Sequence, residues 1–217
     1  MSSLLEGLQY LSVDSISLSA EDFLESVGLR DVSPIDIDLL VEQCGFHVVP
    51  HPGMIRDSNV RAFTTPDWKE IWIDHALYFD QEGASRFSLA HELGHLVLHK
   101  DIIDSISEEH PVADLESAYD RILTLSSMPA YGRMEKQSDL FAGLLLVPRR
   151  KLLPEFTSTV NNVLPMIREA KAAGVPRVDY LDAVIDRVAS IIAPKFSVDR
   201  MVVTMRITED GLAKHIP

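Results

Sequence analysis

The sequence predicts an α+β fold in which a small antiparallel sheet packs against a mainly helical domain. Short segments rich in Val and Ile are confined to residues 46–74, where turn residues separate them. Helical periodicity of apolar residues dominates from residue 81 onward. With 46% hydrophobic and 24% charged residues among 217, the chain has the composition of a globular protein with a sizeable core.

Two helices are expected before the sheet. Ser19 is the expected N-cap of the first helix, because Asp22 follows three residues later and approximates a capping box. The second helix is expected to begin at residues 33–36 (SPID), where the proline suits the first turn. It should run to about Gln43 and stop at Gly45, since glycine commonly ends helices.

Three strands are expected next, at residues 46–50 (FHVVP), 60–64 (VRAFT) and 70–74 (EIWID). In the last of these, isoleucines alternate with other residues, which is the two-residue period of a strand. Turn residues such as Pro-Gly and Thr-Pro-Asp lie between the strands. We therefore expect a small antiparallel sheet.

The remaining chain is expected to be mostly helical. A long helical pattern at residues 81–100 precedes an acidic stretch, residues 101–131, that is expected to be irregular because prolines interrupt it. Three further helices are expected, at residues 133–147, 158–173 and 177–192. The final segment, residues 196–207 (FSVDRMVVTMRI), is expected to be a helix capped by Ser197, with a strand as the alternative because of its valine-rich composition.

These elements are expected to form three regions. Residues 1–32 form an N-terminal helical extension, and residues 33–153 form the main domain with the sheet and the long helix. Residues 154–217 form a C-terminal helical region that packs on the main domain.

Composition and charge exclude several classes of protein. No apolar run approaches the roughly 18–20 residues that a membrane span needs, and the N-terminus lacks the positive region of a signal peptide. The single cysteine, Cys44, cannot form an internal disulfide or a thiolate-rich zinc site, so a cytoplasmic protein is expected.

A net charge of −13 argues against nucleic acid as the main ligand. Residues 149–206 nevertheless hold 10 Lys/Arg against 6 Asp/Glu, which leaves open a basic docking surface.

The segment RFSLAHELGHLVLH, residues 86–99, carries the strongest functional signal. His91 and His95 are four residues apart, so both imidazoles lie on one face of a helix and can bind one metal ion. Glu92 is rotated by about 100° from His91, which leaves it free to take a proton from a water at the metal. The competing interpretation is a buried helix with two core histidines, and the complete HELGH pattern weighs against it.

A third metal ligand is expected on the helix that begins near residue 133, because catalytic zinc sites have three protein ligands and an open position. Glu135 and Asp139 are again four residues apart. Glu135 has the longer side chain and could reach the ion, whereas Asp139 could accept the second N–H of a ligand histidine. An acid that stabilises a helix N-terminus is the alternative interpretation of Glu135.

The two segments together resemble the ImmA/IrrE family of zinc metallopeptidases, which has the gluzincin arrangement of HEXXH followed by ExxxD. That family carries RFTLAHELGHLLLH and then ExxANxFAxxLLMP, and this chain has RFSLAHELGHLVLH at 86–99 and EKQSDLFAGLLLVP at 135–148. The order of elements is similar, more loosely, over residues 33–206.

The resemblance implies a zincin-like domain with Zn²⁺ bound by His91, His95 and Glu135 and with Glu92 as the catalytic base. Asp139 would hold a ligand histidine in place. His99, one turn beyond His95, could be an outer hydrogen-bond donor or a helix C-terminal cation. It is not assigned to the metal, because the family often has histidine here without using it as a ligand.

This chain departs from the family pattern in two places. Ser138 stands where the family usually has alanine, and Asp139 where asparagine is common. The His95–Glu135 spacing is longer than in compact members, and the excess is assigned to residues 107–120 (SEEHPVADLESAYD). This acidic insertion is expected to be a solvated surface loop, with a cover over the cleft as the alternative. Four residues are candidates for stabilising an oxyanion: Tyr78, Tyr119, Tyr131 and His110.

The expected function is that of a zinc-dependent endopeptidase, although manganese or iron would also suit the ligand set. The resemblance implies a helix-turn-helix transcriptional repressor as substrate, and a role in transcription regulation and stress response.

The alternative from another class is a metal-binding regulatory or toxin–antitoxin component that acts by protein or DNA binding. A hydrolase of small amides is a third possibility. A groove for an extended peptide beside the strand at residues 70–74 would favour the peptidase. The oligomeric state is left open.

Overall fold

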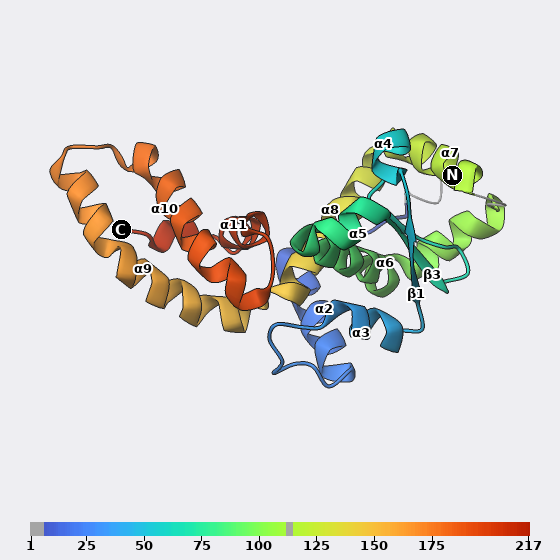
Figure 1. The fold of residues 1–217 in the computed structure, drawn as a ribbon, viewed down its shortest axis with the longest axis horizontal. Coiled ribbons are helices and arrows are strands. Elements are labelled where there is room, and N and C mark those ends of the chain that lie inside the picture. The colour runs from blue at the N-terminus through green and yellow to red at the C-terminus, as the bar shows by residue number, and fades with distance from the viewer. Residues whose placement is uncertain (1–6, 112–114) are drawn as a thin grey trace.

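The computed structural model describes residues 7–111 and 115–217. It is mainly helical with one three-stranded sheet, which confirms the α+β class (Figure 1). No helix within these ranges is long and apolar enough to cross a membrane. In chain order the elements are α2 (Val13–Ser26), α3 (Ile37–Gln43), β1 (His47–His51), α4 (Met54–Ser58), β2 (Ala62–Thr64), β3 (Glu70–Asp74), α5 (His75–Asp80), α6 (Glu82–Glu109), α7 (Leu115–Ser126), α8 (Pro129–Leu146), α9 (Arg149–Ala172), α10 (Arg177–Ile192), η1 (Ala193–Phe196), α11 (Arg200–Glu209) and η2 (Leu212–His215).

The sheet is mixed, so the expectation of a purely antiparallel sheet is wrong. Its strand order is β1-β3-β2, with β3 parallel to β1 and antiparallel to β2. The chain reverses direction twice between β1 and β3, which is why these two strands run the same way. Strand β3 is therefore central, and β2 lies at an edge.

The sheet packs on α6 through its central strand. Ile71 and Ile73 of β3 are fully buried and belong to the same apolar cluster as Leu89 and Leu93 of α6. The alternation predicted for residues 70–74 is thus the burial pattern observed, and it holds the HELGH helix beneath the sheet.

Helices α6 and α8 lie close together because α6 has a glycine where they cross. A Cβ atom placed on Gly94 would lie 3.0 Å from Cα of Ser138 and 3.2 Å from its carbonyl oxygen. Ser138 itself is fully buried. The missing side chain therefore lets the α8 backbone reach the histidine-bearing face of α6.

Gly94→Ala is expected to lower the free energy of unfolding by up to about 2 kcal/mol, because overpacking of about 1–3 kcal/mol is offset only in part by the roughly 1 kcal/mol that alanine gains in a helix. Gly132→Ala on α8 is the matched control, since nothing lies within 4 Å of its added Cβ. It should raise stability by up to about 1 kcal/mol. Urea unfolding of both variants checks this, and stabilisation by Gly94→Ala would show that the two helices are not in tight contact.

Helix α2 begins earlier than expected. Ser12 is its N-cap, and its hydroxyl accepts a hydrogen bond from the Ser15 backbone N–H. Ser19 lies inside the helix instead, where its hydroxyl donates to the Ser15 carbonyl. The predicted cap was wrong because Ser12 supplies the same capping chemistry about two turns earlier.

Two other helix starts differ from the prediction. Helix α3 is capped by Asp36, whose carboxylate accepts from the Leu39 N–H, so residues 33–36 precede the helix. The last segment is helical as predicted, but α11 has Asp199 as its N-cap. Ser197 has φ of 52° and ends the short 3-10 helix η1.

The stretch 101–131 is largely helical, so its prediction as irregular is wrong. Helix α6 continues to Glu109, α7 covers Leu115–Ser126, and α8 starts at Pro129. Proline is tolerated in a first turn, where its missing N–H would have no helical partner. Helix α9 similarly begins at Arg149 and continues through Pro154 and Pro165, well before the predicted start at 158.

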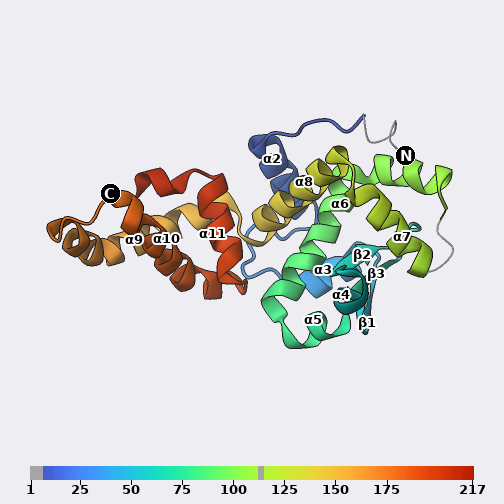
Figure 2. The same cartoon turned by 90° about the horizontal axis from the view of Figure 1, so that it is seen from above.

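Helices α9, α10 and α11 form a lobe beside the part of the molecule that holds the sheet (Figures 1 and 2). The predicted helix at 177–192 is confirmed as α10. The division into regions 1–32, 33–153 and 154–217 stays a prediction, and its second boundary falls within α9.

Basic residues at the start of α9 join this lobe to α2 and to the turn that follows it. Arg149 pairs with Asp14 at 3.1 Å, and Arg150 pairs with Asp31 at 2.8 Å. These cations therefore have partners within the chain, which weakens their interpretation as a docking surface.

Candidate metal centre

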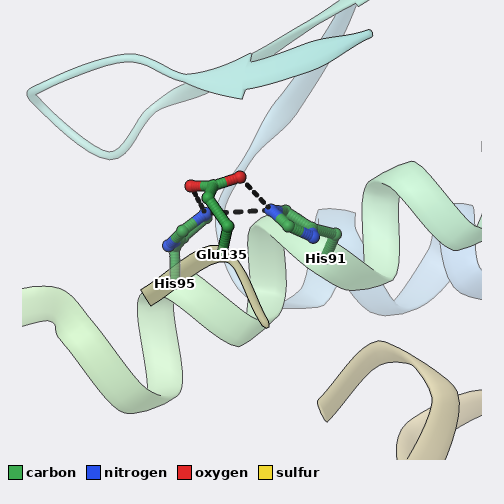
Figure 3. A group of neighbouring side chains, drawn as sticks. All are labelled: His91, His95 and Glu135. Carbon is green, nitrogen blue, oxygen red and sulfur yellow. Dashed lines mark hydrogen bonds and ion pairs between the residues drawn. The ribbon is translucent and has the colours of Figure 1, made fainter. Parts of the chain in front are cut away.

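His91, His95 and Glu135 converge on one point (Figure 3). The Nε2 atoms of His91 and His95 are 3.0 Å apart. The carboxylate of Glu135 reaches them from α8, with Oε2 at 3.3 Å from His91 Nε2 and Oε1 at 3.4 Å from His95 Nε2. The structure thus brings together the three residues that the sequence predicted as metal ligands.

The spacing of these atoms suits a tetrahedral metal ion. Donors bound at about 2.0–2.1 Å in a tetrahedron lie about 3.3–3.4 Å apart. The two Nε2 atoms are somewhat closer, at 3.0 Å, and each lies at a comparable distance, 3.3 or 3.4 Å, from a different oxygen of Glu135. Oε1 of Glu135 is also a buried oxygen without a hydrogen-bond partner among the described residues, as expected of an atom placed to bind a cation. The donor set therefore fits a zinc ion.

Each histidine is held through the ring nitrogen that faces away from this point. His91 Nδ1 lies 2.8 Å from Asp139 Oδ1, as predicted for the second acid of the α8 motif. His95 Nδ1 lies 3.2 Å from the hydroxyl of Ser138. An N–H on each Nδ1 leaves the Nε2 lone pairs free for a ligand.

The three residues perturb one another's protonation. Burial raises the pKa of Glu135, but the interactions of its carboxylate with His91 and His95 outweigh burial and hold that pKa well below its usual value. Burial lowers the pKa of His91. Its hydrogen bonds to Asp139 and Glu135 have the opposite and larger effect, and they raise this pKa to about 10. In the metal-free protein, the carboxylate is thus ionised and His91 carries a proton at neutral pH.

Metal binding is therefore expected to displace a proton from His91. Its ring should remain an imidazolium at pH 8 in the metal-free protein and titrate near pH 10. Because that proton competes with the metal for Nε2, zinc affinity should increase as the pH rises. Ring ¹⁵N NMR shifts check this, and a neutral His91 ring at pH 8 without metal would contradict it.

Glu92 occupies the position expected of a proton acceptor. It is 5% exposed, and its Oε2 accepts a hydrogen bond of 2.8 Å from the hydroxyl of Thr64 on strand β2. Glu92 is not among the three grouped ligands, but it lines the same cavity. The contact with Thr64 was not predicted, since nothing local in the sequence links residues 28 positions apart.

The cavity at this centre has a volume of about 460 Å³. Strand β2 lines one side, and helix α7 contributes Ala118, Arg121, Ile122 and Leu125. The ring of Tyr119 packs edge-on against Phe63 of β2. Residues 115–120 of the predicted insertion thus belong to a helix at the cleft, so the expectation of a solvated loop is wrong for them. Residues 112–114 lie outside the described part of the chain.

Tyr131 is the oxyanion candidate that the structure places at the centre. It lines the cavity, and burial together with its hydrogen bond to Glu135 raises the pKa of its hydroxyl well above the usual value. The hydroxyl therefore stays protonated and can donate. The other three candidates are not in the cavity lining described: Tyr78, Tyr119 and His110.

His99 is buried behind the two histidines. Its Nε2 lies 2.8 Å from Oε1 of Gln137, and its Nδ1 lies 3.3 Å from the Ser138 hydroxyl. Burial lowers the pKa of His99 to about 4, which makes this ring neutral at physiological pH and argues against a role as a helix cation. Gln137 and Ser138 were not predicted as functional residues.

The fold and the grouped ligands define a class of α+β proteins in which an HEXXH helix lies against an ExxxD helix. The family model of the IrrE N-terminal-like domain, a peptidase family, matches residues 41–178, which is more than half of the chain. This chain belongs to that peptidase family. No curated protein and no solved structure matched it.

Proposed function

We propose that this protein is a zinc-dependent endopeptidase. The observation that carries the proposal is the group formed by His91, His95 and Glu135, whose ligand atoms all lie within 4.8 Å of one another. Glu92 lies beside this group, in a cavity large enough for part of a peptide. Membership of a peptidase family supports the same conclusion.

The chain's own residues would share the chemistry as follows. A zinc ion in this group would polarise a water and a peptide carbonyl. The Glu92 carboxylate, oriented by Thr64, would take a proton from that water and pass it to the departing amine. Tyr131 would donate a hydrogen bond to the carbonyl oxygen as negative charge develops on it. Asp139 would keep His91 in the tautomer that presents Nε2.

An extended peptide would bind along strand β2. This strand pairs with β3 on one side and has no strand partner on its other side among the described residues. Its residues Ala62, Phe63 and Thr64 line the cavity, so backbone hydrogen bonds to β2 would lay a peptide across the metal group. A groove directly beside residues 70–74, which would favour the peptidase, has no free strand edge, because β3 is flanked on both sides.

We infer further that the substrate is a protein of the helix-turn-helix repressor type in the cytoplasm, as the family resemblance implies, and that cleavage regulates transcription under stress. The competing role, a regulator that acts by binding, relied partly on the basic residues of 149–206. The pairing of Arg149 and Arg150 with the acids Asp14 and Asp31 gives that role less support.

Cleavage of candidate repressors and of a proteome-derived peptide library tests this proposal. Zinc-loaded wild-type protein should generate new peptide termini, detected by mass spectrometry, that the Glu92→Gln variant does not generate. Binding of a repressor without cleavage by zinc-loaded wild-type protein would favour the binding regulator instead.

A further inference from the structure

We propose that Gln137, His99 and Ser138 form a hydrogen-bond relay that fixes the tautomer of His95, which makes Ser138 a positioning residue for the metal. The relay rests on the proposed function, because that function gives His95 a metal ion to bind. It begins far from the ligands, at a backbone carbonyl of the N-terminal segment.

The direction of the relay is set by Gln9. The side-chain Nε2 of Gln137 donates to the Gln9 carbonyl at 3.1 Å. A carbonyl oxygen can only accept, so the amide nitrogen of Gln137 must face it and Oε1 must face the other way. The reverse orientation would place two acceptor oxygens against each other in a partly buried contact.

His99 transmits this direction to Ser138. Because Oε1 of Gln137 can only accept, His99 Nε2 at 2.8 Å must carry the proton. In the neutral ring Nδ1 is then an acceptor, and the hydroxyl of Ser138 at 3.3 Å donates to it. The only hydroxyl proton of Ser138 is used in this bond.

Ser138 consequently accepts from His95. With its proton committed to His99, its oxygen offers lone pairs to His95 Nδ1 at 3.2 Å, so that nitrogen carries the N–H. The His95 lone pair is then on Nε2, which faces His91 and Glu135. A relay running the opposite way would put the proton on Nε2 and block metal binding there.

The buried location of residue 138 also limits which side chain can form the relay. Ser138 is fully buried, and its backbone packs where Gly94 leaves room for it. Serine combines a small side chain with one donor and two acceptor lone pairs, which the relay requires. The two ligand histidines are therefore held differently: His91 by the carboxylate of Asp139, and His95 by a neutral chain of hydrogen bonds.

Two readouts test the relay without using catalysis. Ring ¹⁵N NMR of the metal-free wild-type protein should show His95 protonated on Nδ1 and His99 protonated on Nε2. The opposite tautomer at either ring would overturn the proposal. This measurement holds even if no metal binds, so a failure of the proposed function does not obscure it.

Zinc affinity, measured by chelator competition, is the second readout. Ser138→Ala should weaken it about tenfold, in line with the loss of an outer hydrogen bond to a ligand. Ser85→Ala is the matched control, because Ser85 is a similarly buried serine, on α6, and lies outside the cavity lining. It should bind zinc as the wild type does. Wild-type affinity in Ser138→Ala would overturn the relay while leaving the zinc peptidase proposal intact.

Gln137→Leu provides an independent test, since Gln137 contacts neither His91 nor His95 in the hydrogen bonds described. Without the acceptor Oε1, the His99 ring should populate the Nδ1–H tautomer. Zinc affinity should fall to an extent similar to that of Ser138→Ala. An unchanged His99 tautomer would show that Gln137 does not set the direction.

Discussion

Glu92→Gln is expected to reduce kcat/KM for peptide cleavage by about 10²- to 10⁴-fold, the usual contribution of general acid–base catalysis. The amide keeps the size of the side chain but cannot take a proton from water. Because Glu92 lies outside the group of three ligand residues, the variant should keep its metal. Steady-state cleavage assays and metal analysis of the same samples measure both effects.

Glu82→Gln is the matched control for this prediction. Glu82 is an exposed glutamate in the first turn of the same helix, so its replacement should leave both cleavage and metal content unchanged. Cleavage by Glu92→Gln at close to the wild-type rate would mean that another group accepts the proton.

Glu135→Ala is expected to weaken zinc binding by more than the roughly 10- to 100-fold that loss of an outer partner costs, because it removes a ligand itself. Glu135 is the only anionic member of the group, and it alone comes from α8. Two neutral imidazoles on one helix would remain, without the charge that balances the ion. Equilibrium dialysis followed by metal analysis measures the loss, and cleavage should disappear with it.

Asp139→Asn serves as the comparison variant. Its amide can still accept from His91 Nδ1, although it lacks the negative charge, so zinc affinity should fall less than in Glu135→Ala. Tight binding of one zinc per chain by Glu135→Ala would contradict the assignment of Glu135 as a ligand.

The convergence of His91, His95 and Glu135 could be predicted from the sequence because helical spacing fixes local geometry. Residues four apart on a helix share a face, which places both histidines together on α6 and Glu135 beside Asp139 on α8. The three residues converge only if α6 and α8 also pack face to face. The family resemblance implied this packing, and Gly94 leaves room for it.

Contacts that depend on tertiary pairing could not be predicted in this way. Thr64 reaches Glu92 only because β2 lies at the sheet edge above α6, and the strand order is not encoded in any local period. The Gln9–Gln137 contact joins residues 128 positions apart. Helix α7 was missed for a different reason: its apolar residues do recur at helical spacing, but the acidic residues and the prolines on either side were interpreted as signs of a loop.

The most direct test of the central claim is anomalous diffraction at the zinc absorption edge from crystals of the zinc-loaded protein. We predict one anomalous peak per chain, within about 2.0–2.2 Å of Nε2 of His91, Nε2 of His95 and a carboxylate oxygen of Glu135. A peak elsewhere, or crystals grown with zinc that show none at this group, would contradict the account.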